Sequence, residues 1–304
     1  MVFSDTYLQP DAPDPVLAEE AVVEAARRHA AGAGRLLEVD ESGGEARAYL
    51  LDGGIVMKTQ RPHRLRPRTS LRKEALFLNE LERQGSFPVP RALGYGEVAG
   101  IEYLCLTRIN GVAMEHASVD AKTRAAALDE LGRILRSIHE IDQSSLFESD
   151  LMPGDRTPAD VRTRFSDAFD RLAASLEADG RFAGIDVQGV AARCLDGIPG
   201  STTPVALHSN PGPEHSFVDP ASGAFVGLID FGDAYRSHPA LDLRPWTDAA
   251  DGEALLAGYR ASGPLPGGFE DVWRTGLVIV ELARASRGLR SPEELSASLD
   301  RLLG

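Results

Sequence analysis

The stretch VALHSNPGPEHSFVD, residues 205–219, is followed by GLIDFGDA, residues 227–234. An apolar segment leads into a loop rich in Pro and Gly that is flanked by two histidines, and a second apolar segment ends in Asp230. A carboxylate at the end of a strand can hold a metal cation against phosphate oxygens. An aspartate in this position can also simply cap the turn that follows. The pattern therefore raises a metal site as a hypothesis and leaves the structural reading open.

The two histidines of this loop allow different interpretations. His215 could share a cation with Asp230, because neutral imidazole is a metal ligand. His208 follows an apolar segment, which favours a buried histidine that is hydrogen-bonded to backbone. The spacing of the two residues does not match the usual zinc motifs, so we do not expect a zinc site.

The pattern of apolar residues changes near residue 108. Before it, RLLEVD, ARAYLLD and IVMKTQ are separated by the turns ESGGE and DGG, which predicts three antiparallel strands. Two further strands are predicted around a turn at residues 99–100. After it, the apolar residues recur with a helical period. We therefore predict an α+β fold, with a small antiparallel-sheet lobe in residues 1–107 and a larger, mainly helical lobe in residues 108–304.

Several helix ends are also predicted. Asp14 followed by Pro is typical of the start of a helix, so a first helix is expected from there to about residue 30. Thr69 or Ser70 is expected to cap a helix that ends near Gly85. Residues 205–230 are expected to contain a short hairpin.

Lys58 ends the segment IVMK, and Glu74 lies on the predicted helix that follows. A lysine on a strand can hold phosphate oxygens, and a glutamate on a neighbouring helix can fix its ammonium group. A solvated surface pair would have the same sequence. The ESGGE turn could bring backbone N–H groups close to a triphosphate, although it is not a Walker motif and an ordinary hairpin turn explains it equally well.

The order of these features resembles the aminoglycoside phosphotransferase and choline kinase superfamily, whose members are relatives of the protein kinases. The resemblance covers roughly residues 20–300. Its most specific parts are IDFGDA and HPALDL (residues 238–243), and YLCLTRINGVAM and LGRILRSIHEID are similar to the hinge and to the helix that precedes the variable insertion. It implies a two-lobed protein-kinase-like fold and ATP or GTP with Mg²⁺ or Mn²⁺ as cofactors. The expected acceptor is a hydroxyl of a small molecule, namely an antibiotic, an amino sugar or an amino alcohol.

The resemblance also assigns roles within the catalytic loop. The family pattern is His-Gly-Asp, four residues and Asn. His208 matches the loop histidine, Asn210 stands at the catalytic aspartate, and His215 stands at the metal-binding asparagine. Asp230 matches the metal-binding aspartate of Asp-Phe-Gly.

The first lobe supplies the expected nucleotide contacts. Lys58 and Glu74 match the phosphate-binding lysine and its helix partner. Thr107 and Ile109 are expected to offer backbone groups to the adenine, behind Leu106.

Asn210 is the main departure from the family pattern. An amide oxygen can accept a hydrogen bond from an attacking hydroxyl but cannot take its proton at neutral pH. Three readings follow. The protein is a kinase in which Glu214 or Asp233 replaces the base or no base is needed, a pseudokinase that binds a nucleotide or small molecule, or a kinase fold diverted to another reaction.

The bulk composition narrows the partners. The chain has 304 residues and a formal net charge of −14, which argues against nonspecific nucleic-acid binding and favours cationic small molecules. Neither a signal peptide nor a membrane-spanning apolar segment is evident, so we expect a cytoplasmic protein. The oligomeric state is not readable. The acidic candidates for binding a cationic ligand are Asp167, Asp170, Asp248, Asp251 and Glu281.

Overall fold

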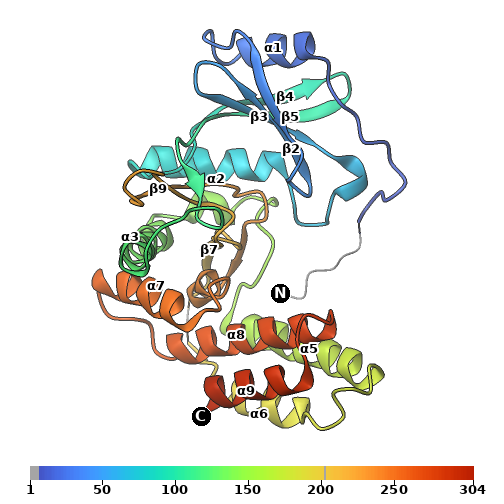
Figure 1. Ribbon diagram of the computed structural model, residues 1–304, viewed down its shortest axis with the longest axis vertical. Coiled ribbons are helices and arrows are strands. Elements are labelled where there is room, and N and C mark those ends of the chain that lie inside the picture. Colours follow the sequence, from blue (N-terminus) through green and yellow to red (C-terminus); the bar gives the residue numbers. More distant parts are fainter. Residues whose placement is uncertain (1–6, 202) are drawn as a thin grey trace.

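The computed structural model describes residues 7–201 and 203–304, and it has a small sheet lobe above a larger helical lobe (Figure 1). The predicted two-lobed α+β architecture is confirmed. The elements of the sheet lobe are α1 (Glu19–Arg27), β1 (Leu36–Asp40), β2 (Ala46–Leu51), β3 (Ile55–Gln60), the 3₁₀ turn η1 (Pro62–Arg64), α2 (Leu71–Gln84), β4 (Ala92–Val98) and β5 (Ile101–Thr107).

The remaining elements build the helical lobe and the segment that joins the two lobes. They are β6 (Val112–Ala113), α3 (Ala121–Glu140), α4 (Ser144–Phe147), α5 (Pro158–Ala178), α6 (Val187–Asp196), β7 (Val205–Leu207), β8 (Ser216–Val218), β9 (Phe225–Leu228), β10 (Tyr235–Ser237), η2 (Pro239–Leu243), α7 (Ala249–Ala261), α8 (Phe269–Ser286) and α9 (Pro292–Leu303). β5 ends at Thr107, and the predicted division of the chain at residue 108 stays a prediction.

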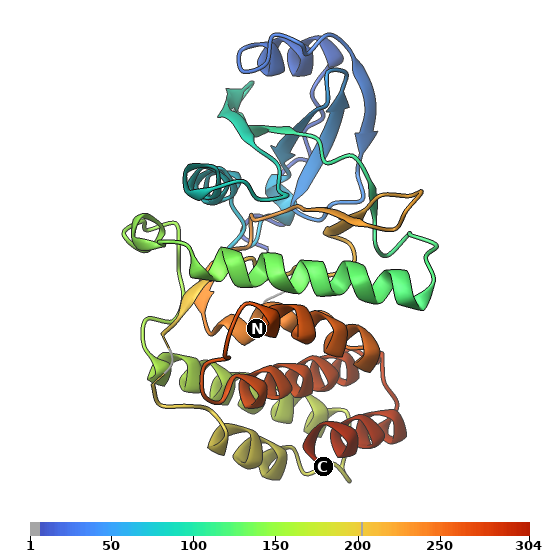
Figure 2. The same ribbon diagram turned by 90° about the vertical axis from the view of Figure 1, so that its left-hand side faces the viewer.

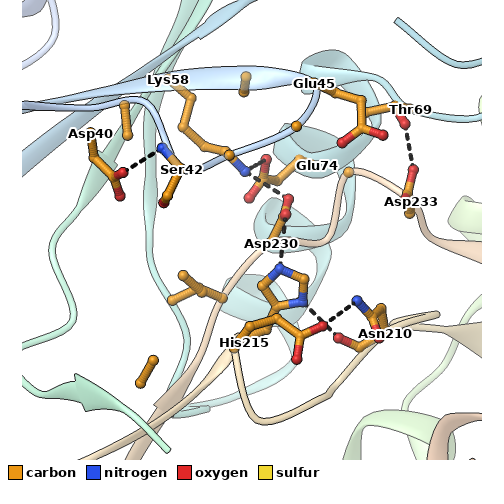
Figure 3. Close-up of a pocket in the computed structure, with 18 of the residues that line it drawn as sticks. Asp40, Ser42, Glu45, Lys58, Thr69, Glu74, Asn210, His215, Asp230 and Asp233 are labelled. Carbon is orange, nitrogen blue, oxygen red and sulfur yellow. Dashed lines mark hydrogen bonds and ion pairs between the residues drawn. The ribbon is translucent and has the colours of Figure 1, made fainter. Parts of the chain in front are cut away.

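The five-stranded sheet has the order β1-β2-β3-β5-β4, and every neighbouring pair is antiparallel. Side chains alternate between the two faces of a strand. Tyr49 and Met57 therefore lie on one face, in an apolar cluster with Val22 of α1. Lys58 projects from the opposite face and is directed toward α2 (Figure 3). The two-residue period of β3 thus determines that Lys58 faces the cleft.

The prediction of a helix from Asp14 is wrong, because α1 begins at Glu19. Asp14 does not cap a helix. Its carboxylate lies 2.6 Å from Arg61 Nη2 and 3.1 Å from Arg47 Nη2. Arg47 is buried, so an ion pair at Asp14 compensates a charge that would otherwise be costly.

Most local signals are confirmed. The turn between β4 and β5 lies at Ala99 and Gly100, and both residues adopt positive φ. Ser70 rather than Thr69 caps α2, since the Ser70 side chain accepts a hydrogen bond from the Lys73 N–H. The hairpin is formed by β8 and β9, whereas β7 pairs with the more distant β10.

Helix α3 crosses the molecule directly below the sheet lobe, with α7 beneath it (Figure 2). The two helices pack closely because each has a glycine at the contact, Gly132 in α3 and Gly258 in α7. A Cβ atom at Gly132 would lie 2.1 Å from the Leu255 carbonyl oxygen, and one at Gly258 would lie 1.8 Å from that of Asp129. This packing holds the helical floor beneath the loop at residues 208–215.

Candidate active site

A cleft of about 710 Å³ lies between the two lobes (Figure 3). Its lining comes from the β1–β2 turn, β3, the start of α2 and residues 111–116, 210–217 and 229–233. Among the predicted site residues, five line the cleft, namely Lys58, Glu74, Asn210, His215 and Asp230. The fold therefore brings together residues that are up to 172 positions apart in the sequence.

Lys58 is held between two carboxylates. Its Nζ atom lies 2.7 Å from Glu74 Oε2 and 2.7 Å from Asp230 Oδ1. Burial disfavours the charged ammonium, but the attraction of Asp230 and Glu74 outweighs it and raises the pKa of Lys58. Burial raises the pKa of Glu74, and the Lys58 ammonium opposes this effect. The predicted lysine–glutamate pair is thus present, with Lys58 kept cationic at the wall of the cleft.

Asp230 links this pair to the helical lobe. Burial opposes its ionisation, but the nearby Lys58 ammonium and His215 lower the pKa of Asp230 below its usual range. Its backbone has φ of 72°, in the left-handed region that non-glycine residues rarely adopt. Such a conformation costs on the order of 1–3 kcal/mol and is common at functional sites. This strained backbone conformation turns the Asp230 carboxylate into the cleft.

The hydrogen bonds of His215 define which ring nitrogen carries a proton. Nδ1 lies 2.8 Å from the Asn210 carbonyl oxygen, which can only accept, so Nδ1 carries the hydrogen. Nε2 faces Asp230 Oδ2 at 3.4 Å. In the neutral ring, the lone pair of His215 Nε2 then faces the negatively charged oxygen of Asp230. A cation between them would resolve this contact, and so would protonation of the ring.

Asn210 lies at the floor of the cleft. Its side-chain NH₂ donates to Glu214 Oε1 at 2.8 Å, and its backbone N–H donates to His208 Nδ1 at 3.2 Å. The amide oxygen is left as the acceptor for a substrate hydroxyl. Glu214 and Asp233, the two proposed substitute bases, also line the cleft, and Asp233 accepts a hydrogen bond from Thr69.

The loop at residues 208–215 is held by a buried carboxylate, Asp242, which was not among the predicted site residues. Asp242 accepts 2.8 Å hydrogen bonds from the backbone N–H groups of His208 and Ser209 and lies 3.0 Å from His139 Nε2. Ser209 has φ of 89°, and these bonds stabilise that strained turn. Asp242 is the aspartate of the motif HPALDL, and this motif is the sequence signal that could have identified it.

His208 is not in the lining of the cleft. It is fully buried, and its Nε2 donates to the Ile229 carbonyl oxygen at 2.8 Å. The interpretation as a buried, backbone-bonded histidine is therefore supported by the geometry. Burial lowers the pKa of His208 to about 4.

The two buried histidines predict a pH-dependent stability. Burial also lowers the pKa of His238 to about 4. An unfolded histidine titrates near 6.5, so the unfolded state binds more protons between these values and stability falls as the pH drops from about 6.5 to about 4. Each histidine contributes about 3 kcal/mol to this loss.

His238→Asn isolates one of these contributions. Asparagine can still accept the Ala240 N–H hydrogen bond that His238 Nδ1 accepts at the start of η2. We expect the unfolding free energy of this variant to vary less with pH below 6.5. An unchanged pH profile in denaturant titrations would show that His238 is not buried in its neutral form.

The β1–β2 turn is held over the cleft by Arg61. Its Nη1 donates to the carbonyl oxygens of Glu41 and Gly43 at 3.3 and 3.2 Å, while Asp14 binds the other side of the guanidinium. Residues 40 and 42–46 line the cleft. Because this turn is the predicted triphosphate contact, Arg61 is expected to position it.

Arg61→Lys tests this role. Lysine keeps the charge opposite Asp14 but lacks the planar fork that reaches both carbonyl oxygens. We expect the KM for nucleotide to rise about tenfold, with kcat nearly unchanged, since hydrogen bonds to charged groups are worth about 1.5–3 kcal/mol. Equal changes in kcat and KM would indicate a general loss of structure instead.

The structure places the predicted hinge residues Leu106, Thr107 and Ile109 outside the lining of the cleft among the described residues. Leu106 is buried in the core, and the Thr107 N–H already donates to the Arg91 carbonyl oxygen at 3.0 Å. Their contact with adenine stays a prediction, and the neighbouring segment 111–113 lines the cleft in their place.

The acidic candidates in the helices do not line the cleft. Asp251 binds Arg124, Asp248 caps α7, and Glu281 binds Arg284 and Arg290. The cleft has its own acidic residues, and the sequence analysis missed several of them. Its lining carries seven carboxylates against Lys58 and Arg66 as the basic residues: Asp40, Glu45, Glu74, Glu115, Glu214, Asp230 and Asp233. A triphosphate here would need cations for charge balance.

Residues 37–272 match the family model described as the phosphotransferase enzyme family. The match covers more than half of the chain. The chain belongs to this phosphotransferase family. The predicted kinship with aminoglycoside phosphotransferases is confirmed at the level of the family, and no curated protein matches the sequence.

Solved structures show the same fold for other phosphotransferases. Macrolide 2'-phosphotransferase MphH from Brachybacterium faecium, an apoenzyme, superposes with a TM-score of 0.62 at 21% identity, over 93% of this chain and 98% of that one. A type I macrolide 2'-phosphotransferase gives 0.62 at 20% identity, over 96% and 99%. The ternary complex of APH(2'')-IIa with streptomycin and ATP gives 0.59 at 16% identity, over 95% and 97%.

In residues 7–201 and 203–304, no helix combines the length and apolarity that a membrane crossing requires. Within the same residues, no cluster of three or more His, Cys, Asp or Glu side chains is arranged to hold a metal ion. The metal hypothesis thus depends on the pair His215 and Asp230.

Proposed function

We propose that this protein transfers the γ-phosphoryl group of ATP or GTP to a hydroxyl of a small molecule, with Mg²⁺ or Mn²⁺ at His215 and Asp230. The observation that carries the proposal is the convergence of three side chains in one cleft. Lys58 Nζ lies 2.7 Å from Asp230 Oδ1, and His215 Nε2 lies 3.4 Å from Asp230 Oδ2.

The donor set fits a cation that is bound jointly by protein and phosphate. Mg²⁺ is commonly held by one or two carboxylates, with water and substrate phosphates completing its coordination. Asp230 supplies a carboxylate of lowered pKa, and the Nδ1–H tautomer of His215 leaves Nε2 free to coordinate. Imidazole nitrogen also suits Mn²⁺. The bound cation would neutralise charge on the phosphate oxygens.

In the proposed reaction, the acceptor oxygen forms a bond to the γ-phosphorus while the bond to the β–γ bridging oxygen breaks. The nucleoside diphosphate leaves, and the acceptor proton passes to a base or to water. Lys58 binds phosphate oxygens, and the β1–β2 turn covers them with backbone N–H groups. Asn210 orients the hydroxyl through its amide oxygen. Positioning and electrostatics dominate such a transfer, so it can proceed without a carboxylate at Asn210.

A second candidate function is nucleotide binding without efficient transfer. The observation that favours it is Asn210 itself, whose amide cannot take the proton and whose NH₂ group is engaged by Glu214. This pseudokinase reading keeps the same cleft and the same cation. Both readings fit the cytoplasm, where the sequence analysis places the protein.

The deciding experiment is a phosphoryl-transfer assay with ATP and GTP, each with Mg²⁺ and with Mn²⁺. The acceptors are macrolides, aminoglycosides and amino alcohols, the first two because the similar structures act on or bind such molecules. Asp230→Asn serves as the matched inactive control. Acceptor-dependent release of nucleoside diphosphate that is lost in this variant supports transfer. Cation-dependent nucleotide binding without turnover on any acceptor supports the binding function instead.

A further inference from the structure

Two arginines from separate segments lie against the ring of Tyr235 in β10, and a third arginine lies near one of them. The Cζ atom of Arg68, which precedes α2, lies 5.6 Å from the centre of this ring. The Cζ atom of Arg164 in α5 lies 5.1 Å from it. Arg244 follows η2 and is close enough to Arg68 to repel its charge. We call these four residues the arginine–tyrosine cluster.

The partners of these arginines in the described part of the chain leave two positive charges, those of Arg68 and Arg244, without a carboxylate. Arg164 forms a bidentate ion pair with Asp155, at 2.7 Å from both carboxylate oxygens, and Asp155 also accepts a hydrogen bond from Ser237. Arg244 donates to the Ser209 carbonyl oxygen at 3.4 Å. For Arg68 and Arg244, the structure of residues 7–201 and 203–304 shows no carboxylate within ion-pair distance. Burial lowers the pKa of Arg68, and repulsion by Arg164 and Arg244 adds to this effect.

Two hydrogen-bonding groups of the cluster are buried without a partner in the described chain. One is Nη1 of Arg68, and the other is the hydroxyl of Tyr235. Tyr235 is fully buried, so its hydroxyl cannot turn to bulk water. A buried polar group without a partner costs about 1–3 kcal/mol, and more when the group is charged. Such a group in a native protein needs an explanation, and a bound ion is one that supplies the missing partner.

We infer that the arginine–tyrosine cluster binds an oxyanion, the phosphate or carboxylate group of a small molecule. A guanidinium presents parallel N–H donors that match two oxygens of such a group, and a tyrosine hydroxyl donates to a third position. The charge of the protein does not explain this gathering, because the chain as a whole carries a net charge of −14. Positive charge is concentrated in this cluster, although the chain as a whole is acidic.

The cluster lies beside the proposed reaction centre. Tyr235 pairs with Leu207, which immediately precedes His208, and Arg244 contacts the residue before Asn210. Arg164 belongs to α5, which follows the segment LGRILRSIHEID in the chain and thus lies in the expected variable insertion. The oxyanion is then an acidic substituent of the acceptor. This assignment rests on the proposed function. Free inorganic phosphate is the other source of the same chemistry.

Calorimetric titration of the full chain with inorganic phosphate, without nucleotide, tests the site. Arg68→Gln removes one of the charges that lack a carboxylate, and Arg72→Gln is the matched control, since Arg72 lies nearby in the sequence and is exposed on α2. Lys58→Met removes the phosphate-binding lysine of the cleft. We expect the affinity to fall about tenfold or more in Arg68→Gln and to persist in the other two variants. Equal binding by Arg68→Gln and wild type, or a loss in Lys58→Met alone, would overturn the inference.

Tyr235→Phe keeps the buried ring and removes only the hydroxyl, so it decides the matter if Arg68→Gln does not fold. Weakened phosphate binding in this variant supports the site, and unchanged binding counts against it.

The source of the oxyanion is identified in the transfer assay with hydroxy acids, sugar phosphates and their neutral counterparts. Preference for the anionic acceptors, with a KM that rises in Arg68→Gln, assigns the oxyanion to the acceptor. Phosphate binding without such a preference assigns the site to free phosphate. Because the titration uses no nucleotide, its outcome is independent of whether transfer occurs.

Discussion

Asn210→Asp is expected to raise the rate of nucleotide-dependent phosphoryl transfer by about 10²–10⁴-fold, the usual contribution of a general base. The wild-type amide orients a hydroxyl but cannot take its proton, whereas a carboxylate at the same position can do both. The neighbouring Glu214, which now accepts a hydrogen bond from the Asn210 amide at 2.8 Å, would face a second carboxylate. Single-turnover kinetics on the best acceptor measures the chemical step directly.

Two controls make this result interpretable. Nucleotide affinity should be unchanged in Asn210→Asp, because Lys58 and Asp230, the proposed phosphate-binding and cation-binding residues, are untouched. Glu214→Gln in the wild-type background tests whether Glu214 already acts as the base, in which case this variant loses activity and Asn210→Asp gains little. A wild-type protein with fast turnover and no gain from the aspartate would show that Asn210 does not limit catalysis.

Lys58→Met is expected to weaken nucleotide binding about 10–100-fold and to lower the free energy of unfolding by about 3–5 kcal/mol. The second effect arises because Glu74, whose side chain is 1% exposed, would lose its cation while remaining buried. Burial already raises the pKa of Glu74, and the loss of Lys58 would raise it further. The destabilisation should therefore be smaller at low pH, where Glu74 can become neutral.

The double variant Lys58→Met with Glu74→Leu separates the two effects. Replacing both members of a buried ion pair by apolar groups of similar size is often neutral for stability. We therefore expect the double variant to recover most of the lost stability in urea titrations while nucleotide binding stays weak. A double variant that is less stable than Lys58→Met alone would show that Glu74 is stabilised by groups other than Lys58.

The residues of the cleft could be predicted where a local pattern carries the information. The two-residue period of IVMK places Lys58 opposite the face that packs on α1, and the apolar segment before Asp230 ends where the chain turns into the cleft. The order of such motifs along the chain was enough to suggest the family and thereby the two-lobed fold. The period of a segment does not reveal which residue, distant in the sequence, a side chain will contact.

The features that were missed all depend on such distant partners. Asp14 has the local signature of a helix cap, but Arg47 and Arg61 bind it, more than 30 residues away. Asp242 fixes the catalytic loop from 33 and 34 residues away and contacts His139 across 103 residues. The acidic lining residues Asp40, Glu45 and Glu115 were missed because they lie at the end of β1 or in loops, where no local period directs a side chain toward the cleft. Charge balance at a site is a property of the assembled fold, and the separate segments do not reveal it.

The central claim is that Lys58, His215 and Asp230 together hold a nucleoside triphosphate and its cation. Calorimetric titration of the wild-type protein with ATP and GTP, each with and without Mg²⁺ or Mn²⁺, tests it most directly. We predict binding that is at least about tenfold tighter with the cation, and a loss of this cation dependence in Asp230→Asn. Absence of nucleotide binding with either cation, or equal binding by wild type and Asp230→Asn, would contradict the claim.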